Sequence, residues 1–305
     1  MLMQSVESYL AIRQAAGFQL RKLSYLLRSF ARFAEARKES LVCAKTAIDW
    51  AGLGSSSFQR ARRLGAVIHF AHYLRAEDQR HEIPPEGIFG SQTRPRPVPY
   101  IFSPEQIRQI IGEASRLKKR DPLLPHTFST LFSLLACTGL RVSEALKLRR
   151  QDLSVDGLVI RESKFRKTRL VPLHVTARAG LERYLALRQR LAPCGEDCLF
   201  VNKRGRPVHY NTVAETFRKI LRTIRLDSTS TRLHPTLHSM RHTFAVRALE
   251  ACPDGRDRVT KHTVALSNYL GHYNVAATYW YLEATANLMN DIAEACDDLV
   301  KGEIK

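Results

Sequence analysis

Hydrophobic residues recur at intervals of three and four along the first 76 positions of the chain. This spacing places them on one face of an amphipathic helix. In one stretch Leu23, Leu27 and Phe30 share a face, while Arg21 and Lys22 are left for the other faces. The pattern predicts an all-helical N-terminal domain over residues 1–80. Its four helices are expected at residues 5–16, 20–36, 44–51 and 58–76.

Prolines interrupt this pattern after the fourth helix. Proline cannot continue a helix or a central strand, so residues 81–102 are expected to form an extended linker. A linker predicts two domains, and 305 residues are enough for each to bury its own core. The next helix has a clear start, because Ser103 can cap it, Pro104 suits its first position and Gln106 can complete a capping box.

The remaining sequence mixes helical and strand-like patterns. Short apolar runs predict paired strands at 158–160 and 170–173 and a third strand at 199–201. Further helices are expected over 127–137, directly after Arg141, and from about positions 211, 239 and 263. The fold class is therefore mainly α with a small β-sheet, and the second domain spans 103–285. Residues 286–305 are expected to be a C-terminal acidic amphipathic helix that docks on a neighbouring protomer through Leu288, Met289, Ile292, Cys296 and Leu299.

The charge balance points to a polyanionic partner. There are 48 Lys and Arg against 29 Asp and Glu, a formal net charge of +19. Each neutralised phosphate releases a counterion, so nucleic acid is the first expected partner and an anionic membrane the second. Arg60, Arg62 and Arg63 stand near a helix N-terminus, where positive charge opposes the helix dipole. Bound DNA would explain them, and a solvated basic face is the alternative.

No apolar run approaches the roughly 20 residues that cross a bilayer, and the N-terminus lacks the pattern of a secretory signal. A cytoplasmic protein without membrane contact is therefore expected. The six cysteines are scattered and are expected to be free thiols. Cys194 and Cys198 resemble half of a metal site, but no second pair lies at ligand spacing. Neither a metal nor a cofactor is expected.

Six residues with phosphate chemistry lie in local motifs of the second domain: Arg141, Lys164, His238, Arg241, His272 and Tyr281. Phosphoryl transfer places negative charge on the non-bridging oxygens, and fixed positive donors stabilise that charge. Arginine suits this task because its planar fork binds two oxygens. Metal-dependent chemistry needs clustered carboxylates instead. Glu144, one turn after Arg141, is expected to orient the helix by hydrogen bonding rather than to bind Mg²⁺.

In order and local sequence, these six residues resemble the active site of the tyrosine recombinase (phage integrase) family, over roughly the C-terminal two-thirds of the chain. The resemblance implies an N-terminal helical core-binding (SAM-like) domain and a C-terminal mixed α/β tyrosine recombinase catalytic domain. It implies double-stranded DNA as partner, bound by a homo-tetramer or by a hetero-assembly with companion recombinases. The implied reaction is site-specific recombination, in integration or transposition, through a 3′-phosphotyrosine intermediate without metal or ATP.

The same resemblance assigns the roles. Tyr281 is the nucleophile, and because a phenol is weak at neutral pH it needs a base, for which His238 is the candidate. Arg141 and Arg241 clamp the phosphate, and His272 donates to a non-bridging oxygen. Lys164 is the candidate general acid for the departing 5′ oxygen. Lys167 is its rival and a further DNA contact.

Three features depart from the family pattern. The interval from Arg241 to His272 is long, which suggests an extra loop at 254–258, and Ala277 stands where threonine is frequent. Tyr279 lies close enough to be mistaken for the nucleophile. The sequence around Tyr281 resembles the transposon-borne branch. Two alternatives remain open: a DNA-relaxing enzyme like type IB topoisomerases, and a non-catalytic DNA-binding accessory protein on the same fold.

Overall fold

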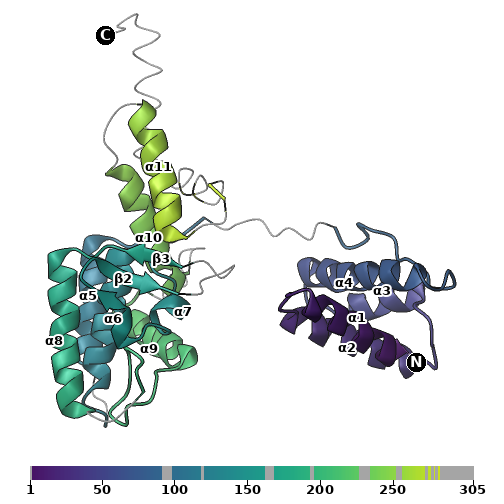
Figure 1. Cartoon of the computed structure of the whole chain (residues 1–305), viewed down its shortest axis with the longest axis horizontal. Coiled ribbons are helices and arrows are strands. Elements are labelled where there is room, and N and C mark those ends of the chain that lie inside the picture. The colour runs from purple at the N-terminus through teal and green to yellow at the C-terminus, as the bar shows by residue number, and fades with distance from the viewer. Residues whose placement is uncertain are drawn as a thin grey trace, which may run out of the picture. The chain divides into compact units, whose positions relative to one another are not determined.

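The computed structural model divides the chain into two compact units, the N-terminal unit over residues 1–97 and the C-terminal unit over residues 98–305. Figure 1 draws the helices of the N-terminal unit in purple to blue and those of the C-terminal unit in blue to yellow-green. The described residues are 2–90, 98–117, 120–161, 168–192, 196–226, 234–251, 256–271 (backbone only at 256–259), 274–275, 278 and 281.

The described residues of the N-terminal unit form a bundle of four helices, which agree with the four predicted from hydrophobic spacing. They are α1 (Leu2–Ala15), α2 (Arg21–Glu35), α3 (Ala44–Gly52) and α4 (Ser57–Arg75). Their apolar faces meet in one core, in which Leu10, Phe30, Trp50 and Phe70 are almost completely buried. The Phe30 and Trp50 rings pack edge to face with centroids 5.5 Å apart. Burial on one face of each helix leaves the arginines of α2 and α4 for the opposite faces.

Both ends of the predicted linker belong to folded units. The amide of Val42 donates to His81 Nδ1 (3.0 Å), and Phe89 packs against the N-terminal core. At the other end Phe102 is buried in the C-terminal core, and its amide donates to Thr243 Oγ1 (2.9 Å). The predicted range 81–102 is therefore too wide. Proline density marked the end of helix, but Phe89 and Phe102 pack on the cores of the flanking units.

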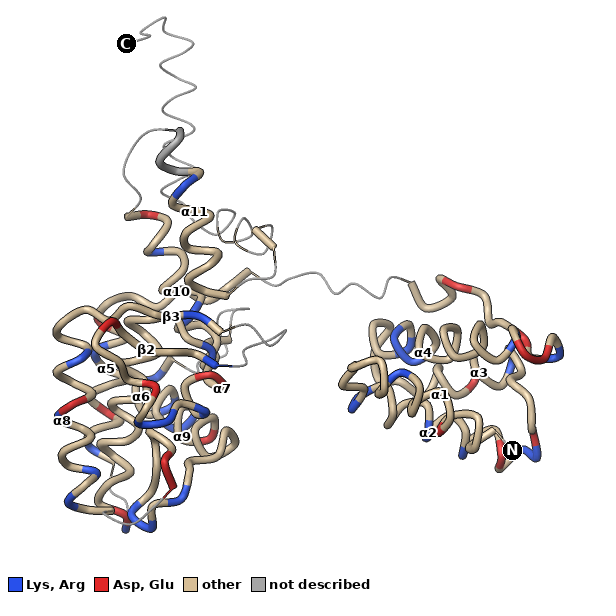
Figure 2. Tube along the Cα trace, in the orientation of Figure 1, with Lys and Arg blue, Asp and Glu red and all other residues tan. Residues whose placement is uncertain are grey.

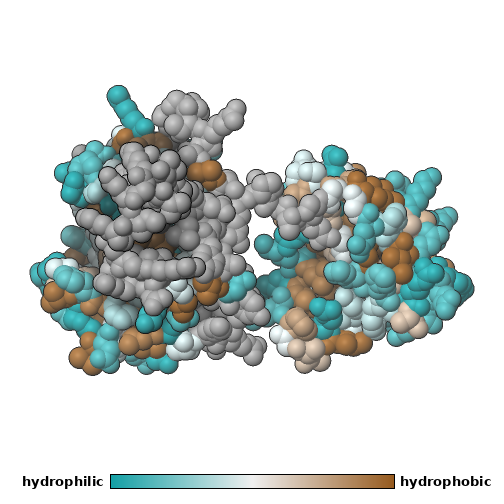
Figure 3. Space-filling view, turned by 90° about the horizontal axis from the view of Figure 1, so that it is seen from above, coloured by the Kyte–Doolittle hydropathy of each residue, from teal (hydrophilic) through white to brown (hydrophobic). Residues whose placement is uncertain are grey.

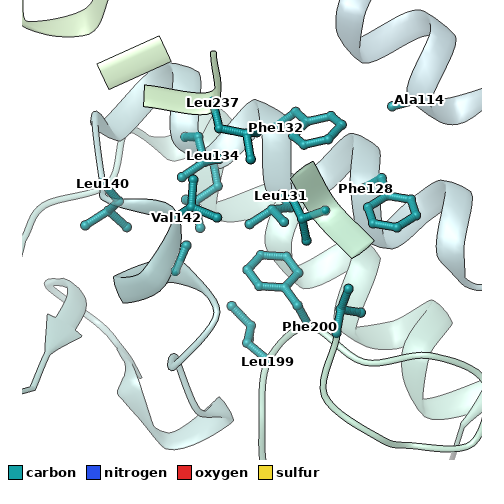
Figure 4. Packing of buried hydrophobic residues seen from close by; sticks show 14 of the residues in the cluster. Ala114, Phe128, Leu131, Phe132, Leu134, Leu140, Val142, Leu199, Phe200 and Leu237 are labelled. Carbon is teal, nitrogen blue, oxygen red and sulfur yellow. The ribbon is translucent and has the colours of Figure 1, made fainter. Parts of the chain in front are cut away.

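The C-terminal unit is built around α6 (Leu124–Thr138), which α5 (Pro104–Ser115), α8 (Val175–Leu191) and α10 (Leu237–Glu250) contact. Figure 4 shows Phe128, Leu131, Phe132 and Leu134 of this helix pointing into a common core with Phe200. The predicted capping box of α5 is confirmed, because Ser103 Oγ accepts from the Gln106 amide and Gln106 Oε1 accepts from the Ser103 amide. Helix α9 (Tyr210–Thr223) adds Phe217 to the same core, 5.4 Å from the Phe132 ring.

A three-stranded antiparallel sheet lies beside these helices, in the order β1 (Leu153–Ser154), β2 (Gly157–Ile160) and β3 (Arg169–Val171). The predicted pairing of the second and third strands is confirmed, with Val159 opposite Leu170. The strand predicted at 199–201 is wrong. That segment is buried and makes only isolated bridges, and its Leu199 amide donates to the Leu148 carbonyl (2.7 Å). A one-turn 3-10 helix, η1 (Arg150–Asp152), precedes the sheet.

Two helices differ from expectation. Helix α8 was not predicted, because its amphipathic pattern is weak and broken by Gly180. Helix α11 (Arg256–Leu270) begins seven positions before the predicted start. The extra loop predicted at 254–258 is therefore wrong for 256–258, which are helical, while 254–255 lie outside the described residues. The fold class itself, mainly α with a small sheet, is confirmed.

The surface of the N-terminal unit is mixed in character. On the face drawn in Figure 3, hydrophilic residues separate smaller apolar groups. Among the exposed apolar side chains are Tyr25 on α2 (73% exposed) and Leu53 (65% exposed). Across the part of the chain that the structure describes, no helix has the length and apolar character needed to cross a membrane.

Candidate active site

A tight turn between α6 and α7 (Val142–Ala145) delivers Arg141. Helix α6 ends at Gly139, whose φ of 59° lies in the left-handed region that favours glycine. A Cβ at this position would also overlap the ring of Phe244. The chain then enters α7 with Arg141 as its N-terminal cap residue, and the side chain of Arg141 is 25% exposed. One predicted phosphate ligand is therefore open to an approaching substrate.

Glu144 holds Arg141 in place. One carboxylate oxygen accepts from Arg141 Nη1 (2.8 Å), and the other accepts from the Arg141 amide (3.1 Å). The carboxylate also accepts two hydrogen bonds from Arg169, at 3.2 and 2.9 Å. Only 6% of the Glu144 side chain is exposed. The prediction that Glu144 orients this helix by hydrogen bonding is confirmed.

Arg241 joins two helix ends. It lies on α10 and is 2% exposed, and its Nη1 donates to the carbonyl of Gly139 (2.8 Å) while its Nη2 donates to that of Leu270 (2.7 Å). These carbonyls stand at the C-termini of α6 and α11, where backbone oxygens lack partners within the helix. Burial, followed by the nearby charge of Arg141, lowers the pKa of Arg241 to about 10, so it stays charged at neutral pH.

Two histidines and Tyr281 lie next to this arginine pair. The rings of His238 and His242, one turn apart on α10, meet nearly at right angles with centroids 4.5 Å apart. The Tyr281 ring lies 5.5 Å from that of His242 and is buried in a small cluster with Val246, Leu266 and Leu270. Residues far apart in the sequence are thus brought to one end of α10.

Desolvation and neighbouring positive charge favour the neutral form of both imidazoles at neutral pH. Crowding by protein atoms, followed by the charges of Arg241 and Arg141, lowers the pKa of His238 to about 4, although this residue still reaches solvent. Burial, followed by the neighbouring His238 and Arg241, lowers the pKa of His242 to about 3. A neutral imidazole can accept a proton, which is what a general base requires.

Four of the six predicted catalytic residues, Arg141, His238, Arg241 and Tyr281, are therefore found in one region. The remaining predictions fall on residues outside those described: Lys164, Lys167, His272, Ala277, Tyr279, Cys194 and the tail 286–305.

The N-terminal unit carries a second candidate site, a basic cleft between α2 and α4. Figure 2 shows Lys and Arg along both helices. The cleft measures about 540 Å³, and none of the described residues that line it is acidic. Arg63 forms part of its floor, because its guanidinium stacks 4.2 Å from the centroid of the Trp50 ring. The remaining lining residues are Arg21, Lys22, Tyr25, Leu26, Ser29, Gln59 and Arg62.

The three arginines predicted to contact DNA therefore have different surroundings. Arg62 is exposed and lines the cleft, and Arg63 lines it in the stacked position. Arg60 does not line the cleft, and its Nε donates to the carbonyl of Gly54 (2.8 Å) at the start of α4. The sequence did not associate Arg21 and Lys22 with these residues, because only the packing of α2 against α4 brings them together.

Two active-site neighbours were also not predicted. Arg169 begins β3 and reaches Glu144, and its Nε donates to the Tyr269 carbonyl (2.8 Å). The only sequence signal was a charged residue immediately before a short apolar strand. His242 follows Arg241 directly, and a helical wheel would have placed it one turn from His238.

The comparisons with known proteins identify the family of the chain. The model of the phage integrase family matches residues 101–287, which is more than half of the chain. The site and the fold define a DNA strand-breaking and rejoining enzyme. The chain belongs to the phage integrase family, the tyrosine recombinases. The predicted family is thereby confirmed.

Several relatives are similar over most of their length. A putative integrase/recombinase, y4rB, of Sinorhizobium fredii is 35% identical over 297 residues, which is 94% of each chain. The tyrosine recombinase XerC of Pseudomonas savastanoi pv. phaseolicola is 31% identical over 234 residues, covering 75% of this chain and 70% of that protein.

Solved structures share the fold at low identity. The Tn1549 transposon integrase in complex with transposon right end DNA has a TM-score of 0.66 and 18% identity, covering 96% of this chain and 98% of that one. The XerH site-specific recombinase in a post-cleavage complex with palindromic difH substrate has a TM-score of 0.65 and 17% identity, covering 91% and 80%.

Proposed function

We propose that this chain is a site-specific recombinase of a mobile element that cuts and rejoins double-stranded DNA through a covalent 3′-phosphotyrosine at Tyr281. The observation that carries the proposal is the convergence of Arg141, His238, Arg241 and Tyr281 at one end of α10. Arg241 donates to the carbonyl of Leu270, the last residue of α11, and Arg141 donates to that of Gly271, the next residue. The Tyr281 ring packs on His242, the residue after Arg241.

In the proposed reaction the phenol oxygen of Tyr281 attacks phosphorus and the bond to the 5′ oxygen breaks. His238 accepts the phenol proton, and its lowered pKa keeps it neutral and able to do so. An anionic phosphate between the arginines would raise that pKa and strengthen the base. Arg141 and Arg241 stabilise the charge on the non-bridging oxygens. From the sequence, Lys164 supplies the proton to the 5′ oxygen and His272 adds a donor.

Strand exchange is favoured over DNA relaxation or simple binding. The relatives and structures named above are described as integrases or recombinases. The transposon integrase among them supports a role in a mobile element. A buried nucleophile with a neutral base and two fixed arginines has no use in a protein that only binds DNA.

Both units are proposed to bind the DNA. The basic cleft of the N-terminal unit offers Arg21, Lys22 and Arg62 for phosphates, with Gln59 and Tyr25 able to reach base edges. Phosphate contacts of this kind are independent of sequence, whereas a side-chain amide in the major groove discriminates between bases. The cleft is therefore proposed to set where on the DNA the catalytic residues act.

Assembly on the DNA is proposed from the tail. Residues 282–305 carry six acids against two lysines, a net charge of −4, which disfavours burial against DNA. Their apolar stripe needs a protein surface, for which a second protomer is the proposed source. Deleting 286–305 should spare binding of one protomer to a half-site and weaken cooperative occupation of a full site. Unchanged cooperativity would remove the tail from this role.

The proposed chemistry is tested by trapping the covalent intermediate on a nicked suicide substrate. Tyr281→Phe should abolish the adduct and leave DNA binding nearly unchanged, because only the nucleophilic oxygen is lost. Tyr279→Phe is the matched control and should keep the adduct. Excess EDTA should not prevent cleavage, since arginine, histidine and lysine supply the positive charge. Loss of the adduct in Tyr279→Phe together with its retention in Tyr281→Phe would overturn the assignment.

A further inference from the structure

Three arginines share the C-terminal end of α11. The carbonyls of Tyr269, Leu270 and Gly271 accept hydrogen bonds from Arg169 Nε (2.8 Å), Arg241 Nη2 (2.7 Å) and Arg141 Nη2 (3.4 Å), respectively. The last carbonyls of a helix lack intrahelical partners and form the negative end of its dipole, so cations stabilise them. One helix end is therefore held by the two predicted phosphate ligands and by Arg169.

Arg169 differs from the other two arginines in its second contact. Its two terminal nitrogens bind the carboxylate of Glu144, which also binds Arg141. Arg169 is 11% exposed at its side chain, whereas Arg141 is 25% exposed. Arg169 is thus the less accessible partner of the shared carboxylate, and Arg141 faces the space that a phosphate would enter.

The charge balance of this cluster depends on Arg169. Two guanidinium groups on one carboxylate leave a net charge of +1. Without Arg169, Arg141 and Glu144 would form a neutral pair, and the carboxylate would compete with a phosphate for Arg141. Burial by itself raises the pKa of Glu144, but the hydrogen bonds and charge of Arg169, and after them those of Arg141, lower it overall. Glu144 therefore stays ionised at neutral pH.

Resting on the proposed function, in which Arg141 binds the scissile phosphate, we propose that Arg169 is a positioning residue of the recombination reaction. It neutralises Glu144, so that Arg141 keeps its positive charge for the phosphate. It also fixes the Tyr269 carbonyl, and with it the turn from which the chain continues towards Tyr281. Because Arg169 is the first residue of β3, the same contacts also hold β3 against Glu144 and the end of α11.

The test measures the single-turnover rate of adduct formation on two suicide substrates. One carries the natural phosphodiester, and the other carries a methylphosphonate in which a neutral methyl group replaces a charged non-bridging oxygen. Arg169→Gln should slow adduct formation on the phosphodiester about 10- to 100-fold, the usual effect of removing a partner that orients a ligand-binding group. The loss should be much smaller on the methylphosphonate, because that substrate makes less use of the charge of Arg141. Equal losses on both substrates would mean that Arg169 acts only on the fold.

A second substitution tests the charge argument directly. Adding Glu144→Gln to Arg169→Gln removes the competing carboxylate and frees Arg141, so the double variant should be faster than Arg169→Gln alone. Arg169→Lys keeps the charge but loses the planar fork, and it should keep most of the rate on the phosphodiester. A double variant slower than the single one, or a Lys variant as slow as the Gln variant, would overturn the proposal.

Arg178 provides the matched control. It is another partly buried arginine of the same unit, and its Nη2 donates to the carbonyls of Ser154 and Val155 (2.6 and 2.7 Å) at the turn between β1 and β2. Arg178→Gln should leave the ratio of the two substrates unchanged. If wild-type protein forms no adduct on the phosphodiester, the proposed function fails; if it does and Arg169→Gln matches it, only this inference fails.

Discussion

The arginines of the two units are used in opposite ways. In the C-terminal unit Arg241 is buried and Arg169 is mostly buried, and both are held by backbone carbonyls or by Glu144. In the N-terminal unit Arg21, Lys22 and Arg62 are exposed around an open cleft. Catalysis requires charge that is already in place when the transition state forms. Attraction to a DNA backbone only requires charge near the surface, and it tolerates side chains that move.

Removing a buried arginine should therefore damage both stability and activity. Arg241→Gln leaves the carbonyls of Gly139 and Leu270 without their charged donor, which should cost roughly 2–5 kcal/mol of unfolding free energy. Adduct formation should fall by about 10²- to 10³-fold, as for loss of one fixed donor. Denaturant unfolding and suicide-substrate assays measure the two effects. Arg62→Gln is the contrast, with a change in unfolding free energy within about 0.5 kcal/mol. Equal stability of both variants would break the comparison.

Two glycines extend the comparison from charge to backbone. Gly139 and Gly17 both have positive φ, 59° and 86°. A Cβ at Gly139 would overlap Phe244, whereas no atom of the described residues lies within 4 Å of a Cβ at Gly17. Gly139→Ala should cost roughly 2–5 kcal/mol, from the left-handed backbone and from overpacking together. Gly17→Ala should cost about 1 kcal/mol, from the backbone alone. Similar melting temperatures for the two variants would show that the turn before Arg141 is not tightly packed.

Substituting the exposed arginines should change the salt dependence of DNA binding rather than the stability of the protein. Arg62→Ala and Arg21→Ala should each weaken DNA binding and reduce the slope of log K against log [salt] by about 1, because one phosphate contact is lost. Arg60 lies outside the cleft, so Arg60→Ala is the matched control and should change the slope less. Fluorescence anisotropy over a salt series measures this. An unchanged slope in Arg62→Ala would place the DNA elsewhere.

The smallest expected effect concerns pH. In the DNA-free protein His238 and His242, with pKa values of about 4 and 3, should show no imidazole titration by NMR between pH 7.5 and 5.5. Folding lowers these two pKa values from the ordinary 6.5. Between the two pH values the unfolded chain therefore binds more protons than the folded chain. Their contribution to stability is thus present above about pH 6.5 and is lost as the pH falls towards 4. His242→Gln should flatten this pH dependence of the melting temperature, and an unchanged slope would exclude a perturbed His242.

Much of the fold followed from the sequence because the forces involved are local. Helical spacing predicted α1 to α4, and the Ser103–Gln106 capping box is an interaction between residues three positions apart. Paired apolar runs predicted β2 and β3. The predictions failed where a segment's partners are distant. Residues 199–201 are apolar like a strand, but the Leu199 amide donates to the Leu148 carbonyl and Val201 forms only an isolated bridge with Pro207.

The candidate site divides in the same way. Arginine, histidine and tyrosine in recognisable motifs predicted Arg141, His238, Arg241 and Tyr281 as active-site candidates without any structure. The sequence alone determined which residue types are available for phosphate chemistry. Only tertiary structure decided that Arg169, Arg241 and Arg141 share the end of α11, and that Arg62 joins Arg21 across two helices. The physical reason is that these side chains come together from positions about 30 to 130 residues apart in the sequence. Every helix ends in carbonyls without intrahelical partners, so only the packing of the helices decides which carbonyl a given arginine contacts.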